Sequence, residues 1–215
     1  MALEVYDFRN DEDICQMLVC PEIRCRFMRV EPGTTQTGQH SHDLGHEIFL
    51  ILQGRCEFQI ADETAVLEPG QLCIALSDEP HKIRVIGDEP MIMYLSVTPH
   101  IQPTHTSRND DGSRHPLSFS PNSSYEVETD TVTPAEELVD RFVAASDNYA
   151  QTLRNAADNQ QKVAVKLKEA LKSGDFAQME EYRNQLWQGV YQGYKQMYSL
   201  GDLWNTLAPR ISNFR

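Results

Sequence analysis

The stretch PGTTQTGQHSHDLGHEIFLILQG, residues 32–54, decides which fold we expect for this chain. It opens with a Pro-Gly turn, passes two histidines separated by one residue, and ends in an apolar run closed by Gly54. Side chains alternate between the two faces of a strand, so the imidazoles of His40 and His42 point the same way. A short turn over residues 43–45 can then fold Glu47, on the following strand, back toward both histidines.

A third histidine, His81, begins a later strand, where it shares a face with Ile83 while Lys82 points the other way. Three imidazoles and one carboxylate that face a barrel interior form a mixed nitrogen–oxygen site. Such a site suits one divalent ion of Fe, Mn, Ni, Zn or Cu and leaves coordination positions for a substrate. The expected ligands are His40, His42, Glu47 and His81. His46 precedes Glu47 and is expected on the outer surface or in a turn.

The surrounding residues, 20–98, are expected to form short strands. Runs rich in Ile, Val, Phe and Leu are separated by turn sequences such as EPG at 68–70 and GDEP at 87–90. This regular spacing is typical of a β-sandwich or a small barrel. The run 48–52 is apolar on both faces, so we expect another element or another subunit to cover its outer side.

The same residues resemble the first motif of the cupin superfamily, His-x-His, four residues, Glu, six residues, Gly, which here runs from His40 to Gly54. The second cupin motif is matched by Gly70 and His81, with Leu-Ser-Asp at 76–78 where the family often has Pro-x-Gly. The resemblance covers residues 22–98. It implies a small jelly-roll β-barrel that holds one divalent metal ion per chain with the four residues above. The alternative is a metal-free cupin barrel whose polar interior residues satisfy one another.

Several apolar residues are expected to line the barrel, some of them as the wall of a substrate pocket: Phe27, Phe49, Ile51, Phe58, Ile74 and Met93. The pattern places no arginine inside the barrel, although Arg26 and Arg29 remain candidates for holding a substrate carboxylate. His100, His105 and His115 are interpreted as solvated histidines. Cys25, Cys56 and Cys73 are interpreted as small buried hydrophobes.

The chain divides into three expected segments. Residues 1–101 form the barrel and its N-terminal lead-in, residues 102–132 a linker or irregular loop rich in Ser, Thr, Asn and Pro, and residues 133–215 a helical extension. The fold class is therefore mainly β, a small barrel followed by an α-helical hairpin.

The helical segment repeats apolar residues at nearly heptad spacing from residue 133 onward. A polar stretch at 158–161 leaves open whether one long helix or two short ones precede the stop at Gly174. The next helix carries an aromatic stripe from Trp187 to Tyr198. We interpret the pair as a hairpin packed on itself or on a partner, with an aromatic ligand platform as the alternative.

Composition excludes some partners. The chain has 215 residues, 19 basic against 32 acidic side chains, and a net charge of −13, so phosphate backbones and anionic membranes should repel it. No apolar run approaches the ~20 residues of a transmembrane helix, and the acidic N-terminus does not resemble an export signal. Five cysteines without a Cys-x-x-Cys pair favour the reducing cytoplasm. The doubly apolar strand and the long helices favour a homodimer.

Two classes of function remain. The first is a metal-dependent cupin enzyme acting on a small organic substrate, with a dioxygenase-type oxidoreductase as the leading reaction. The second is a non-catalytic cupin that binds a metal or small ligand and uses the helices as an oligomerisation or interaction module. A weaker third hypothesis makes the helical hairpin the functional part, docking a larger complex through its aromatic stripe.

Overall fold

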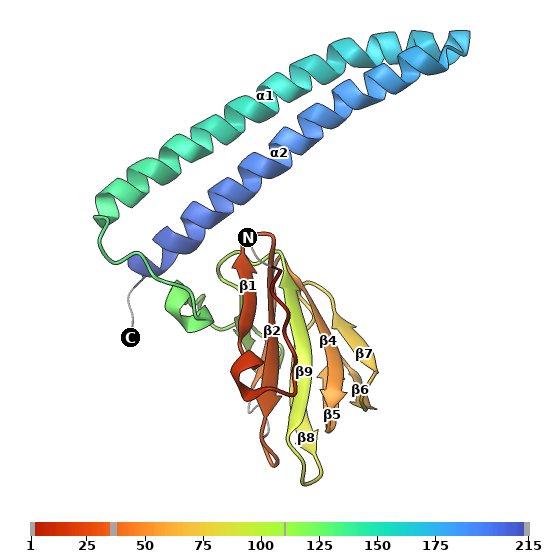
Figure 1. Cartoon of the computed structure of the whole chain (residues 1–215). Coiled ribbons are helices and arrows are strands. Elements are labelled where there is room, and N and C mark those ends of the chain that lie inside the picture. The colour runs from red at the N-terminus through yellow and green to blue at the C-terminus, as the bar shows by residue number, and fades with distance from the viewer. Residues whose placement is uncertain (1–2, 35–37, 110, 213–215) are drawn as a thin grey trace. The chain divides into compact units, whose positions relative to one another are not determined.

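A computed structural model describes residues 3–34, 38–109 and 111–212 of the chain. The chain forms two compact units, one made of residues 1–130 with 208–215 and the other of residues 131–207 (Figure 1). The first unit holds the strands and the second most of the two long helices. The predicted fold class, a barrel of short antiparallel strands followed by a helical hairpin, is confirmed.

Two five-stranded antiparallel sheets make up the first unit, in the orders β1-β2-β9-β4-β7 and β10-β3-β8-β5-β6. Their strands are β1 (Gln16–Cys20), β2 (Ile23–Val30), β3 (Gln39–Ser41), β4 (His46–Gln53), β5 (Arg55–Ile60), β6 (Glu63–Leu67), β7 (Leu72–Ala75), β8 (His81–Ile86), β9 (Met91–Thr98) and β10 (Thr106–Arg108). Two 3-10 turns, η1 (Asp11–Asp13) and η2 (Asn122–Tyr125), flank them along the chain.

The core lies between the inner faces of the two sheets. Strand β4 alternates strictly, so Glu47, Phe49 and Ile51 are buried while the residues between them are half-buried. The β4–β5 turn depends on Gly54, whose φ is +70° and whose missing Cβ would lie 2.7 Å from the carbonyl oxygen of Pro90. This turn joins the two sheets and holds the inner face of β4 against that of β5.

The outer face of β4 and β7 is apolar. Ile48 pairs with Ile74 and Leu50 with Leu72, and the two β7 side chains are 47% and 51% exposed. The predicted double-sided apolar character of β4 therefore continues onto the edge strand. We call these four residues the outer apolar patch.

Residues 102–130 differ from the expected linker or irregular loop over 102–132. They belong to the first compact unit, where β10 pairs with β3 and η2 follows. Gln102, Thr104 and Thr106 are buried, with exposed fractions of 2–4%. Polar side chains that hydrogen-bond one another can be buried without the apolar periodicity by which a strand is recognised in a sequence.

The second unit is built from α1 (Ala135–Ser173) and α2 (Phe176–Arg210). The polar stretch at 158–161 does not interrupt α1, which is a single helix of 39 residues. It ends at Gly174 in the left-handed conformation, and the Asp175 carboxylate then accepts a hydrogen bond from the Gln178 amide at 3.1 Å. The helices are antiparallel, since the Phe142 and Trp204 rings lie 5.5 Å apart.

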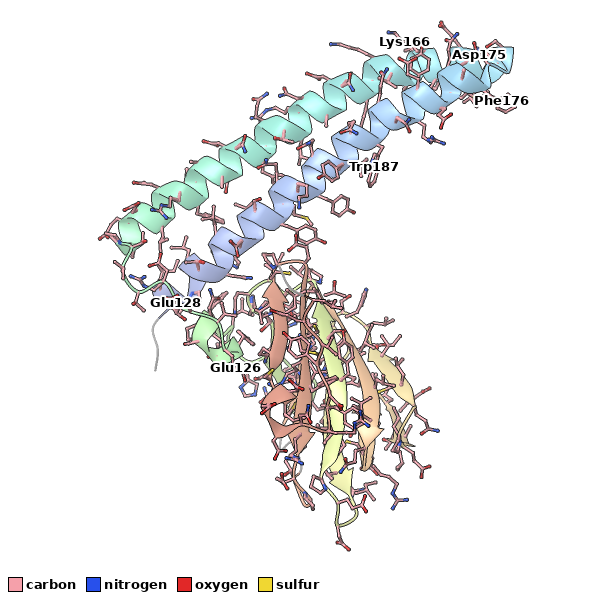
Figure 2. The ribbon with its side chains drawn as sticks, in the orientation of Figure 1. Glu126, Glu128, Lys166, Asp175, Phe176 and Trp187 are labelled. Atoms are coloured by element: carbon pink, nitrogen blue, oxygen red, sulfur yellow. The ribbon has the colours of Figure 1, made fainter. Side chains whose placement is uncertain are left out.

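Large apolar side chains remain exposed on the hairpin. Phe176 is 81% exposed and Trp187 56% (Figure 2). Tyr191 and Tyr194, which belong to the predicted aromatic stripe, are 43% and 57% exposed. No helix within the described ranges combines the length and the hydropathy that a membrane crossing requires.

Candidate metal centre

The structure brings the four predicted ligands together from separate segments. His40 lies in β3, His42 follows that strand, Glu47 lies in β4, and His81 opens β8 opposite His40. One ligand atom from each residue lies within 4.8 Å of all the others. His42, Glu47 and His81 are at most 3% exposed. His46, as expected, lies on the outer side, where its Nδ1 accepts a hydrogen bond from the Ser77 amide.

The donor atoms converge, and their separations bracket those of neighbouring ligands on a single ion. Glu47 Oε2 lies 2.8 Å from His42 Nε2, 2.9 Å from His81 Nε2 and 3.8 Å from His40 Nε2. His40 Nε2 and His81 Nε2 are 3.0 Å apart. Bonds of about 2.1 Å place neighbouring ligands of one ion roughly 3.0 to 3.4 Å apart, depending on whether the angle is right or tetrahedral. The residues therefore fit one divalent transition ion.

Backbone carbonyls fix the orientation of two imidazoles. His42 Nδ1–H donates to the Thr104 carbonyl, and His81 Nδ1–H donates to the Glu79 carbonyl at 2.9 Å. This leaves the Nε2 lone pair of each ring directed at the cluster. Such second contacts set the tautomer of a ligating histidine and make it a better ligand.

Electrostatics favour the forms that a metal needs. Burial opposes ionisation of Glu47, but its short polar contacts with the His40, His42 and His81 rings outweigh burial and hold the pKa of the carboxyl well below its usual range. Burial lowers the pKa of His40, partly offset by its interaction with Glu47. A charged carboxylate and a neutral imidazole are the ligating forms of these side chains.

The cluster opens onto a cavity of about 250 Å³. Its described lining residues are Arg24, Arg26, Met28, His40, Glu47, Phe49, His81, Ile83, Met93, Leu95, His105, Ser124 and Tyr125. One wall is thus apolar, and Glu47 is the single carboxylate among these residues. The volume lies just below the ~300–1,000 Å³ of pockets for drug-sized ligands, so the cavity suits a small molecule.

Two of the six expected pocket residues, Phe49 and Met93, line this cavity. Ile51 and Phe58 are buried in the core and are not among the lining residues. Phe27 is on the outer face of β2, where its ring packs edge-on against Phe8 and Tyr94, so its expected place was wrong. Ile74 was also misplaced and belongs to the outer apolar patch. Both errors assign a side chain to the wrong face of its strand.

Strand β2 turns its arginines inward. Arg24, Arg26 and Met28 share the cavity side of the strand, and Arg24 is 4% exposed. Burial lowers the pKa of Arg24, partly offset by the charge of Glu47. Of the two arginines considered from the sequence, Arg26 lines the cavity, whereas Arg29 lies outside, paired with Asp11 at 2.7 Å.

Of the histidines interpreted as solvated, His100 is buried and His105 is half-buried against the cluster. The His105 ring lies 5.0 Å from that of His40 and 4.9 Å from that of His42, and burial holds its pKa well below the usual range. His100 is 2% exposed, packs edge-on against Tyr125, and has its pKa lowered by burial to about 3. Both flank the segment after β9, whose polar composition concealed its burial. His115 is exposed, as expected.

The cysteines lie outside the cluster. Cys56 is fully buried, and burial raises the pKa of its thiol to about 11. Cys73 and Cys25 are both half-buried, and burial raises the pKa of the Cys73 thiol to about 12. The interpretation as small buried hydrophobes therefore holds fully for Cys56 and in part for the other two.

Comparison with known proteins finds a family match over part of the chain. Residues 26–98 match the family described as cupin domain. None of the curated proteins matches the chain significantly.

Several solved structures resemble parts of the chain. An uncharacterized conserved protein with a double-stranded β-helix domain from Klebsiella pneumoniae is 18% identical, with a TM-score of 0.45 over 51% of this chain and 100% of that one. KdgF from Halomonas sp. is 21% identical, with a TM-score of 0.36 over 45% of this chain and 78% of its own. Salicylate 1,2-dioxygenase from Pseudoaminobacter salicylatoxidans is 22% identical, with a TM-score of 0.32 over 36% of this chain and 20% of its own. The family match and the two-sheet fold together identify a cupin domain over residues 26–98, within the first unit.

Proposed function

We propose that the first unit is a metal-dependent enzyme that uses dioxygen to oxidise a small organic substrate. The observation that supports this proposal is the cluster of three imidazoles and one carboxylate at the wall of a 250 Å³ cavity. Four protein ligands leave positions free on an ion that prefers six, and those positions are where a substrate or a gas molecule binds.

Each group of residues has a defined task in this proposal. A redox-active divalent ion, when bound, would supply dioxygen activation and Lewis acidity. Glu47 provides the one negative charge that offsets the ion. The carbonyls of Thr104 and Glu79 hold His42 and His81 rigidly, which keeps the donor atoms in place. The apolar wall of the cavity, which includes Phe49 and Met93, excludes water around the substrate.

The experiment has two stages. Elemental analysis of the purified chain should give close to one divalent transition metal per chain, and His42→Ala should lose it, because the ring supplies a buried ligand. His115→Ala removes an exposed histidine and should keep the metal. Oxygen uptake by the Fe(II)-loaded protein is then measured across catechols, thiols and keto acids. Absence of metal in the wild-type chain contradicts the proposal.

A non-catalytic cupin is the second candidate, favoured by the exposed aromatic residues of the hairpin, which suit an interaction module. In that case the wild-type chain holds its metal but takes up no oxygen with any substrate of the panel. The cluster would then serve storage or sensing.

Assembly and location complete the proposal. A homodimer is supported by the outer apolar patch, where two β7 side chains are about half exposed. A cytoplasmic location is supported by five free cysteines, which a reducing compartment preserves. Cell fractionation with an antibody to the chain tests the location.

A further inference from the structure

Arg24 is the least satisfied charged group at the cavity. It is 4% exposed, and its Nε has no hydrogen-bond partner among the described residues. Its guanidinium carbon sits 5.1 Å from the centre of the Tyr125 ring, a cation–π contact that steadies the group. The ring face cannot accept the in-plane N–H bonds of the guanidinium. A buried guanidinium whose Nε–H has no acceptor is costly, so its presence points to an acceptor that arrives from outside.

The cavity carries more positive than negative charge. Arg24 and Arg26 face it from neighbouring inward positions of β2, and Glu47 is the single carboxylate among its described lining residues. Glu47 Oε2 is already engaged by His42 and His81 at 2.8 and 2.9 Å. Arg26 Nε reaches only the Phe27 carbonyl, at 3.4 Å. A divalent ion at the cluster would add further positive charge, so the cavity suits an anion.

We propose that Arg24, assisted by Arg26, forms a carboxylate-binding subsite, so that the ligand of this cavity is a small organic acid. The planar guanidinium presents two parallel N–H groups that match the two oxygens of a carboxylate. The apolar wall, formed by residues such as Phe49, Ile83 and Leu95, would contact the rest of the molecule. The proposal names the substrate class of the proposed function and rests on it in that respect, but the binding of the anion does not require the metal.

Binding of benzoate to the full-length chain tests the subsite. Titration calorimetry is done after dialysis against a chelator, with benzamide as the neutral molecule of the same shape. We expect benzoate to bind at least about tenfold more tightly than benzamide, because a charge-assisted pair is lost with the amide. Equal affinity for the two molecules would overturn the proposal without any mutation.

Substitutions assign the effect to the residue. Arg24→Gln should weaken benzoate binding by about tenfold to a hundredfold and leave benzamide binding unchanged. Arg24→Lys keeps the positive charge but loses the two parallel N–H groups of the guanidinium, so its affinity for benzoate should be intermediate. Arg29→Gln is the matched control, since Arg29 lies on the same strand but outside the cavity, and it should bind like the wild type.

A melting curve separates binding from a structural role. Arg24→Gln removes an unpaired buried charge, so the ligand-free melting temperature should not fall. If Arg24→Gln lowers the melting temperature while Arg24→Lys binds benzoate as tightly as the wild type, Arg24 is a structural residue and the proposal is overturned. Metal content and oxygen uptake are measured separately. Arg24-dependent benzoate binding by a chain that purifies without metal and takes up no oxygen would uphold the subsite and contradict the oxygenase. Metal content and oxygen uptake without selective binding of benzoate would uphold the oxygenase and contradict the subsite.

Discussion

Acid should destabilise the barrel through His100, and the size of the effect follows from burial. In the folded chain the pKa of His100 is about 3, because burial lowers it first and the charges of Arg24 and His42 add to this. In the unfolded chain it returns to about 6.5. A lowered folded pKa means that only the unfolded chain takes up the proton between these values. Stability is therefore complete above pH 6.5 and falls as the pH drops toward 3.

The linkage relation gives the magnitude. At pH 8 neither state binds the proton and the contribution is zero. At pH 5 the unfolded state is almost fully protonated and the folded state is not, which costs about 2 kcal/mol. At pH 3, where the folded state is itself half protonated, the cost is about 4 kcal/mol. His100→Gln should remove this part of the pH dependence. Its free energy of unfolding should thus fall about 2 kcal/mol less than that of the wild type between pH 8 and pH 5.

The assay must follow the first unit alone, because both tryptophans, Trp187 and Trp204, lie in the second. Met91 and Met93 are at most 1% exposed, so their oxidation by peroxide along a urea series reports the opening of the barrel. Metal ions are removed from the protein with a chelator before every measurement. His115→Gln, which removes an exposed histidine, should keep the wild-type pH dependence. If His100→Gln loses as much stability as the wild type at pH 5, the reasoning is refuted.

Two further substitutions test the fold and the assembly. Gly54→Ala should destabilise the barrel by about 3 kcal/mol, because this position combines a positive φ with a 2.7 Å approach of the added Cβ to a carbonyl oxygen. Gly70→Ala is the control: its φ is also positive but the space around it is open, so it should cost about 1 kcal/mol. Both are measured by the same peroxide assay. In light scattering the wild type should have twice the chain mass and Ile74→Asp the mass of one chain, while Val66→Asp, equally exposed on the other sheet, stays dimeric. A wild type that is monomeric at all concentrations, or a dimeric Ile74→Asp, would contradict the proposed patch.

Three residues of the cluster could be predicted together because their geometry is local. His40 and His42 share a face by strand alternation alone, and Glu47 follows after one tight turn. His81 was placed by its position at the start of a strand, and β8 indeed pairs with β3 at these residues. Short-range periodicity was therefore sufficient for His40, His42 and Glu47, whereas His81 was assigned from its strand position and from the resemblance to the second cupin motif.

The face that β2 turns inward was not predicted, although a signal is present in the sequence. Its residues 23–30 read IRCRFMRV, with Arg at every second position until Met28. The ordinary expectation places the apolar set inside, which put Phe27 in the pocket. In this strand the polarity is inverted because the interior is a charged cavity, and Phe27 is covered from outside by Phe8. The alternation of a strand shows which residues share a face, but it does not show which of the two faces points inward.

The burial of the segment after β9 could not be read from composition, because hydrogen bonds rather than apolar contacts hold it. The Gln102 side-chain amide donates to the Ser120 carbonyl at 2.9 Å, and the Thr104 hydroxyl lies 2.6 Å from that of Tyr125. Thr106 donates to Asp43 at 2.8 Å. Each of these pairings joins residues distant in sequence, and a polar stretch gives no sign of which partners it will meet.

These contacts define how much of the chain would have to be transferred for the chemistry to move with it. The family match ends at residue 98, yet the Thr104 carbonyl orients His42, and His105 and Tyr125 are walls of the cavity. A graft that stops at the matched boundary would carry all four donor side chains but neither the anchor of one imidazole nor the closed side of the pocket. The smallest portable form of this site therefore extends to at least residue 125.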